Sequence, residues 1–382
     1  MKTLYLFNPE NDMALASGSP YYMAPASAKK MASDLASLPA WYAEPEGAIL
    51  LGDARQAKWM EEECRWPLEV EWTLELSPEF GRVLPWGWNP ALLRQLRERG
   101  MTGFLSDFPM DAIRALSSRK KSVNLLAKMK LEGTQGESFW VTSVDGVAGI
   151  ASLYDKVLLK APWSGSGKGI QPVCGELDEN LSGWVRRIIK VQGGVVVEPY
   201  YNKVVDFAME FLASKGHVTF AGYSFFEADT RGIYKENLLA SDETIEDRLS
   251  VYVPRKVLEE VREKLLHELP LLLGDTYEGF LGVDMMIVRM ADGYAVHPCV
   301  EINLRMNMGV VSRLFFDRYV SPESCGRYII EYYPHEGDAL CFHEEMKREH
   351  PLCVRDGKIK EGYLSLTPVF GDTAYQIFVL VK

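Results

Sequence analysis

The N-terminal part of the chain alternates short apolar runs with amphipathic segments. Residues 3–7 (TLYLF) and 48–51 are apolar runs typical of buried strands, and segments with helical spacing follow each of them. The expected helices in this part are 26–38, 54–64 and 90–99. Strands that alternate with helices in this way are typical of an open α/β domain.

Near residue 116 this pattern ends, and from residue 156 onward strands dominate. A helix is expected from residue 117 to residue 130. The strands expected after it are 156–161, 170–173, 194–199, 204–213, 217–226, 281–290, 294–303, 363–369 and 374–381. Helices are expected at 178–191 and 254–268, with short helices in 309–333. The second part of the chain therefore has the composition of an α+β unit.

The overall composition is that of a globular protein. Of 382 residues, 47% are hydrophobic and 25% are charged, which excludes a disordered or fibrous chain. The formal net charge of −11 argues against a general nucleic-acid or anionic-membrane surface. The six cysteines form no CxxC pair, the first apolar run is too short for a secretory signal, and no apolar stretch could span a membrane. We expect a cytoplasmic protein with reduced thiols.

A glycine-rich loop follows the strand expected at 156–161, within the segment VLLKAPWSGSGKGI. Glycines let the backbone approach a phosphate and direct several N–H groups at it. The spacing is not that of a P-loop, which requires glycine at the position of Pro162. It is also not that of a dinucleotide fingerprint, which requires glycine at the position of Ile170. Two interpretations remain, a hairpin loop that closes over phosphates and a plain hairpin turn.

Two carboxylates are expected to face each other in the hairpin that follows. Asp292-Gly293 is a strong signal for a two-residue loop, and that loop would place Asp284 opposite Glu301. Their Cβ atoms would then lie about 4.5–5.5 Å apart, with Asn303 on the same face. Carboxylates so close favour a cation or a shared proton, and with an amide oxygen they suit Mg²⁺. The alternative is an ordinary hairpin whose acids point to solvent.

Further polar residues are candidates for contact with a substrate. The turn after the first strand lies where open α/β sheets place ligand loops. Its residue types also favour turns in general, so it could equally be a plain turn without a ligand. A polar and aromatic segment spans residues 231–237. The substrate candidates are Asn8, Glu10, Asn11, Tyr234, Lys235, Asn237 and Asn307. A C-terminal group of histidines and cysteines matches no common zinc spacing.

In their order and spacing these motifs resemble the ATP-grasp superfamily. The resemblance rests on Lys160, the glycine loop, VVVEPYYNKVVDF (195–207) and VEINLRMN (300–307), and it covers roughly residues 117–315. It implies ATP bound between two α+β subdomains, together with Mg²⁺. The implied domains are an N-terminal α/β domain (1–116), a small subdomain with the glycine loop (117–200) and a large subdomain with the metal site and a C-terminal extension (201–382).

The resemblance also implies roles for individual residues. Lys160 and one of Lys120 or Lys121 would hold phosphates, and Arg305 would steady the transferred phosphoryl group or the intermediate. The implied metal ligands are Asp284, Glu301 and Asn303. The residues implied to cover the β- and γ-phosphates are Ser164, Gly165, Ser166, Gly167, Lys168 and Gly169. Those implied to bind adenine and ribose are the hinge Glu198, Pro199 and Tyr200, and Asp206.

Simpler interpretations of these residues stay open. Glu198 and Asp206 could be charges at strand ends, and the two lysines of the helix start could be solvated. Members of the superfamily often have proline after the metal-binding asparagine, where this chain has Leu304.

The function implied by the resemblance is an ADP-forming ligase. ATP would phosphorylate a small-molecule carboxylate, and an amine (or a thiol) would attack the resulting acylphosphate. The expected partners are thus small-molecule carboxylate and amine substrates, with neither nucleic acid nor a membrane. A kinase that phosphorylates a hydroxyl and a non-catalytic nucleotide-binding module are the alternatives.

Overall fold

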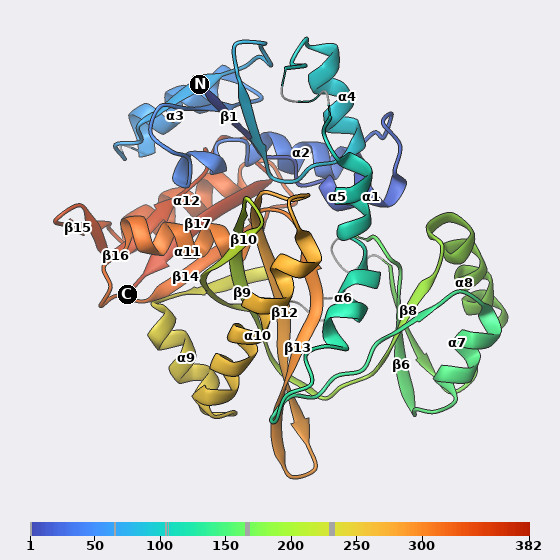
Figure 1. Cartoon of the computed structure of the whole chain (residues 1–382). Coiled ribbons are helices and arrows are strands. Elements are labelled where there is room, and N and C mark those ends of the chain that lie inside the picture. The colour runs from blue at the N-terminus through green and yellow to red at the C-terminus, as the bar shows by residue number, and fades with distance from the viewer. Residues whose placement is uncertain (1, 65, 104, 106, 165–168, 229–233) are drawn as a thin grey trace.

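The computed structural model shows three sheets, each with its own helices (Figure 1). It describes residues 2–64, 66–103, 105, 107–164, 169–228 and 234–382. Among these residues the sheets occupy 3–85, 139–199 and 203–381. The fold class predicted from the sequence, an open α/β domain followed by two α+β units, is confirmed. The exact boundaries at residues 116 and 200 remain predictions.

The N-terminal unit is a parallel sheet in the order β3-β2-β1-β4. Its strands are β1 (Thr3–Leu6), β2 (Gly47–Leu50), β3 (Val70–Thr73) and β4 (Arg82–Pro85). Its helices are α1 (Asn11–Ser17), α2 (Ala26–Asp34), α3 (Ala54–Trp59), α4 (Pro90–Glu98) and α5 (Met110–Leu116), with short helical turns η1 (Leu38–Trp41) and η2 (Met60–Cys64). Helix α4 begins as its sequence predicts, because Asn89 accepts a hydrogen bond from the Leu92 N–H and Pro90 occupies the first turn.

The second unit is a small antiparallel sheet in the order β5-β8-β6-β7, drawn in green in Figure 1. Its elements are α6 (Arg119–Leu126), β5 (Phe139–Val141), α7 (Val144–Ala151), β6 (Lys156–Lys160), β7 (Ile170–Cys174), α8 (Glu179–Gln192) and β8 (Val195–Pro199). Helices α7 and α8 pack on the sheet through a separate apolar core that includes Val147, Val185 and Val197. Strands β6 and β7 are neighbours, so the glycine loop joins the two strands of a hairpin, as expected.

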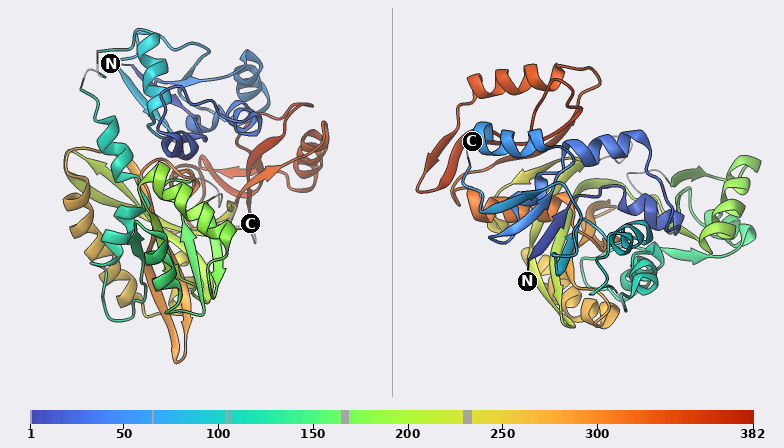
Figure 2. Two further views of the ribbon diagram at one scale, coloured as in Figure 1. Left: turned by 90° about the vertical axis from the view of Figure 1, so that its right-hand side faces the viewer. Right: turned by 90° about the horizontal axis from the view of Figure 1, so that it is seen from above.

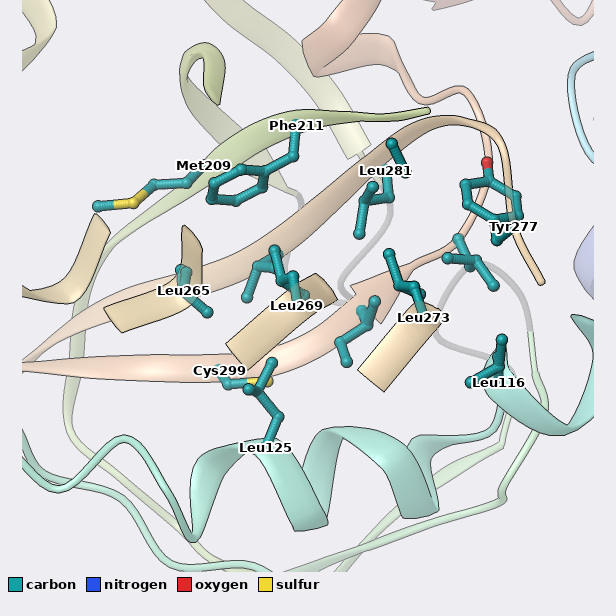
Figure 3. Close-up of a cluster of buried hydrophobic side chains, with 14 of the residues drawn as sticks. Leu116, Leu125, Met209, Phe211, Leu265, Leu269, Leu273, Tyr277, Leu281 and Cys299 are labelled. Atoms are coloured by element: carbon teal, nitrogen blue, oxygen red, sulfur yellow. The ribbon is translucent and has the colours of Figure 1, made fainter. Parts of the chain in front are cut away.

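The third unit is a long sheet in the order β13-β12-β9-β10-β11-β14-β17-β16-β15. Its strands are β9 (Lys203–Ser214), β10 (His217–Ala228), β11 (Tyr234–Leu239), β12 (Gly279–Met290), β13 (Gly293–Asn303), β14 (Gly326–Tyr332), β15 (Cys353–Arg355), β16 (Lys358–Ser365) and β17 (Tyr375–Val381). Its helices are α9 (Asp242–Ser250), α10 (Arg255–Leu273), α11 (Met308–Tyr319) and α12 (Asp338–Glu349). Figure 3 shows Leu265, Leu269 and Leu273, at four-residue spacing on α10, gathered with Phe211 of β9.

One expectation for this unit is wrong. Residues 326–332 form a strand, β14, where short helices were expected throughout 309–333. Strand β14 lies between β11 and β17, and a Cβ at Gly326 would lie 2.3 Å from the Leu380 carbonyl oxygen. Only a residue without a side chain lets the two strands pair so closely, which local sequence cannot reveal.

The C-terminal strands bind the N-terminal unit to the long sheet. Two views in Figure 2 show the red C-terminal segment beside the blue N-terminal one. The buried Trp41 donates its indole N–H to the Leu366 carbonyl oxygen (2.6 Å), and Asp34 accepts from the backbone N–H of Tyr375 (3.0 Å). These contacts hold the N-terminal unit against the C-terminal segment of the long sheet. Among the described residues, no helix combines the length and the hydropathy needed to cross a membrane.

Candidate functional site

Asp284 and Glu301 face each other across β12 and β13, as the sequence predicts. The turn differs from the expected one, because Met290 pairs with Gly293 and the loop is Ala291-Asp292. If the pairing set by that turn continued along the strands, Asp284 would not lie opposite Glu301. The prediction of the turn is therefore wrong, although the predicted pairing is confirmed.

A bulge in β13 restores the alignment. Met286 pairs with His297 and Asp284 pairs with Glu301, so β13 has two extra residues over the same stretch. Pro298 lies in the extra stretch, and proline in a sheet is found where no ladder hydrogen bond is donated.

The paired carboxylates continue into a network of polar side chains. The Asn303 amide donates to Asp284 Oδ2 (2.8 Å), and its Oδ1 accepts from Arg305 (3.0 Å). Arg305 donates through Nε and Nη2 to the two oxygens of Asp12, each at 2.8 Å. Burial, and after it the charge of Glu301, raises the pKa of Asp284 to about 7. Asp284 thus has an environment that favours a cation or a proton.

Arg119 is a residue of this site that sequence reasoning missed. It opens α6 after the Ser118 cap and is 5% exposed. Its guanidinium donates to Glu301 Oε2 (2.7 Å), Ser164 Oγ (2.7 Å) and the Ala161 carbonyl oxygen (2.8 Å). It therefore ties the carboxylate pair to the start of the glycine loop.

The two lysines that follow Arg119, which were expected to bind phosphate, lie outside the cavity that Arg119 lines. Lys120 is exposed, and its Nζ lies 5.1 Å from the centre of the Trp140 ring. Lys121 is half-buried. Neither residue lines the cavity that holds the carboxylate pair.

The glycine loop lies partly outside the described residues. Gly165, Ser166, Gly167 and Lys168 belong to the part that the structure leaves undescribed. At its two ends, Ser164 binds Arg119, and the Gly169 carbonyl oxygen accepts from the Ala161 N–H (2.8 Å). A Cβ at Gly169 would lie 2.6 Å from Cβ of Ser164, and φ there is 148°, so glycine closes the loop.

Lys160 lies with the expected hinge. Its Nζ forms an ion pair with the Glu198 carboxylate, and both side chains are buried. Glu198 also accepts from Ser138 Oγ (3.1 Å). Pro199 ends β8, and half-exposed Tyr200 has Lys156 Nζ 3.6 Å from its ring centre.

Two further residues belong to this region. Asp206, on β9, forms an ion pair with Lys203, and burial raises its pKa. His297 is fully buried, and within the described residues neither of its ring nitrogens has a partner. Burial lowers the pKa of His297 to about 4, so its ring is neutral at pH 7. Sequence reasoning did not single out His297.

A cavity of about 330 Å³ lies between the carboxylate pair with its two arginines and the N-terminal unit. Pro9, Asp12 and Trp86 of the N-terminal unit line it, and so do the bulky side chains of Phe226, Met308 and Ile330. The predicted site residues that it brings together are Ser164, Tyr234, Asp284, Glu301, Asn303, Arg305 and Asn307. Those that do not line it are Lys120, Lys121, Lys160, Gly169, Glu198, Pro199, Tyr200, Asp206, Asn8, Glu10, Asn11, Lys235 and Asn237.

The turn after β1 has mainly structural contacts. The Asn8 amide donates to the Gly87 carbonyl oxygen (2.8 Å) and accepts from the Gly87 N–H (3.2 Å). The buried Asn11 amide meets that of Asn89 at 3.0 Å. Glu10, whose pKa burial raises, lines a separate cavity of about 700 Å³ within the N-terminal unit.

Glu210 on β9 is a second residue that lines the cavity and that sequence reasoning missed. It is 1% exposed, and burial raises its pKa to about 8. Asn307 caps α11 with its Oδ1, which accepts from the Val310 N–H (2.9 Å), and its Nδ2 donates to Glu210 Oε2 (2.8 Å). The buried Asn237 donates to Ser224 Oγ (2.6 Å), whereas Lys235 is exposed.

Within the described residues, the C-terminal histidines and cysteines do not come together as a metal site. In the described part of the chain, no three His, Cys, Asp or Glu residues lie where they could together hold a metal ion. His343 is buried, and its Nδ1 lies 2.9 Å from the Tyr363 hydroxyl.

Comparison with known proteins confirms the fold. No protein-family model matches the sequence, and no curated protein matches it. Among solved structures, biotin carboxylase from Campylobacter jejuni is 12% identical with a TM-score of 0.53, over 100% of this chain and 87% of that chain. N5-carboxyaminoimidazole synthetase from Staphylococcus aureus, solved with ADP, is 11% identical with a TM-score of 0.50, over 100% and 93%. The chain has the ATP-grasp fold.

Proposed function

We propose that the protein is an ATP- and Mg²⁺-dependent ligase that joins a small-molecule carboxylate to an amine and releases ADP and phosphate. The observation that carries this proposal is the grouping of Asp284, Glu301 and Asn303 with two arginines in one cavity. The two solved structures named above, one a complex with beta-gamma-ATP and the other with ADP, support it through their shared fold.

The donor groups present fit a magnesium ion. Two carboxylates and an amide oxygen are hard oxygen ligands, and one or two carboxylates with substrate phosphates are the usual Mg²⁺ environment. Asp284, Glu301 and Asn303 would hold the ion. When bound, it would supply positive charge against the phosphate oxygens of ATP.

The arginines of the chain would do the remaining electrostatic work. The carboxylate of Asp12 fixes Arg305 by two parallel hydrogen bonds, so the orientation of its guanidinium is set before substrates bind. Arg119 is likewise fixed at the start of the glycine loop, where we expect it to face phosphate oxygens. Lys160, paired with Glu198, would hold phosphates nearer the hinge. Preorganised cations of this kind lower the barrier because they need no reorganisation during the reaction.

The reaction has two steps. A substrate carboxylate oxygen attacks the γ-phosphorus of ATP. The bond between this phosphorus and the bridging oxygen breaks, and ADP leaves with its electron pair. The amine nitrogen then attacks the carbonyl carbon of the acylphosphate, phosphate departs with the electron pair of the broken C–O bond, and the amine loses a proton.

Phosphorus NMR of a turnover mixture, with detection of hydroxamate by its coloured ferric complex, tests the proposal. The mixture would contain ATP, Mg²⁺, hydroxylamine as a general amine and a panel of small carboxylic acids. We expect ADP and free phosphate to appear together with a hydroxamate for at least one acid, because hydroxylamine traps an acylphosphate. A stable phosphate ester on a hydroxyl of an added substrate would contradict the proposal and indicate a kinase.

A further inference from the structure

One residue that lines the cavity is a buried carboxylate, Glu210, and no lysine or arginine of the described residues forms an ion pair with it. Glu210 lies on β9, within the long sheet, and its side chain lines the cavity. Its Oε2 accepts from Asn307, but within the described residues no donor reaches Oε1 and no lysine or arginine pairs with the carboxylate. Buried carboxylates are normally paired, since an isolated buried charge is very unfavourable. Among the described residues, Glu210 therefore has no direct ion-pair partner.

Two glycines make room for this carboxylate. A Cβ at Gly282 would lie 2.4 Å from Glu210 Oε2, and a Cβ at Gly309 would lie 2.3 Å from Oε1 and 2.4 Å from Ser224 Oγ. Any larger residue at either position would push the carboxylate out of its place. The carboxylate thus occupies a built recess, formed by β12 on one side and the start of α11 on the other.

The surroundings of the recess are partly polar and partly apolar. The Ser224 and Tyr234 side chains line the cavity, and the Tyr234 hydroxyl is buried without a partner among the described residues. Apolar walls beside them come from Phe226, Met308 and Ile330. A ligand that fits has one positive end for Glu210 and a short apolar body.

We propose that Glu210, with Ser224 and Tyr234, binds the ammonium group of the amine substrate, which is a small primary amine with a mostly apolar body. The proposal rests on the proposed function, because it assigns the amine substrate of that ligase to this end of the cavity. It adds a specificity-determining residue, Glu210, outside the expected phosphate and metal sites.

The geometry favours an ammonium over other cations. A guanidinium prefers both oxygens of a carboxylate, and Oε2 of Glu210 is already bonded to Asn307. A divalent metal needs several hard oxygen ligands, and Glu210 is not part of any group of three acidic, histidine or cysteine residues that could hold one in the described chain. An ammonium has three donors on one nitrogen, which suits a single free carboxylate oxygen beside two hydroxyl groups.

Calorimetric titration of the full chain with n-butylammonium chloride at pH 8 tests this inference. We expect binding with a Kd on the order of a millimolar, as befits so small a ligand, and at least tenfold weaker binding to Glu210→Gln. The uncharged n-butanol, of similar shape, should bind neither protein measurably. Glu236→Gln is the matched control, because Glu236 lies on β11 next to Asn237, on the opposite face of the sheet, and pairs with Arg327.

Several outcomes would overturn the inference. Equal butylammonium binding by wild type and Glu210→Gln, or no binding by wild type, would do so. Loss of Mg²⁺ binding without nucleotide in Glu210→Gln, with butylammonium binding unchanged, would identify a metal ligand instead. Binding of Mg-ATP measured in parallel separates the two proposals. If Mg-ATP binds but butylammonium does not, the ammonium site is wrong and the ligase proposal stands. The reverse result removes the ligase proposal, and with it the assignment of the ammonium as a ligase substrate, but leaves the ammonium site itself.

Discussion

Replacing Glu301 by glutamine should lower the rate of ATP-dependent turnover about a thousandfold or more. Glu301 faces Asp284 and is one of the proposed metal ligands, so its loss removes charge that would hold Mg²⁺ against the transferred phosphoryl group. Nucleotide affinity should fall several-fold at most, because Lys160 and the glycine loop are unchanged. Initial rates of ADP release and calorimetry with an ATP analogue measure the two effects separately.

The control is Glu361→Gln, an exposed carboxylate on β16. It should leave both rate and affinity unchanged. Turnover by Glu301→Gln at the wild-type rate would contradict the proposed metal site, and so would a loss of nucleotide binding as large as the loss of rate.

Replacing Arg119 by methionine should destabilise the protein by about 3–5 kcal/mol, because the change leaves a carboxylate without its buried partner. Arg119 is 5% exposed, and its hydrogen bonds join Glu301, Ser164 and Ala161 across three segments of the chain. Methionine keeps the apolar stem and removes only the charged fork. Urea unfolding followed by fluorescence measures the free energy of unfolding.

A double-mutant cycle identifies the source of this loss. If the Arg119–Glu301 ion pair is responsible, the double variant Arg119→Met/Glu301→Gln should lose less stability than the sum of the single variants, by about 1–3 kcal/mol. Additive losses would contradict the coupling. Arg327→Met is the control, since Arg327 is exposed and its pair with Glu236 at 3.6 Å should contribute less than about 1 kcal/mol.

The sequence predicted most of the fold because its local signals agree with the final contacts. Alternating apolar residues predicted β6, β8, β9, β10, β12 and β13 to within a few residues. Strand β14 was missed because its pairing depends on Gly326 and a partner strand near the C-terminus. Distant partners of this kind leave little local trace in a sequence.

The site was predictable where its residues are neighbours in one hairpin. Asp284 and Glu301 were paired correctly, although the turn was placed one residue too late and the bulge at Pro298 was not foreseen. Arg119 and Glu210 were missed because their roles arise from long-range contacts, 182 residues apart for Arg119 and Glu301 and 97 apart for Asn307 and Glu210. Arg119 directly precedes Lys120 and Lys121, and in the sequence alone a buried arginine in such a run cannot be told from its solvated neighbours.

Calorimetric titration with a non-hydrolysable ATP analogue, in the presence and absence of Mg²⁺, tests the central claim most directly. We predict that one nucleotide binds per chain, that Mg²⁺ strengthens binding, and that the complex melts at a higher temperature than the free protein, because ligand binds only the native state. No heat of binding and no change in melting temperature at millimolar nucleotide and Mg²⁺ would contradict the claim that this protein is an ATP-dependent ligase.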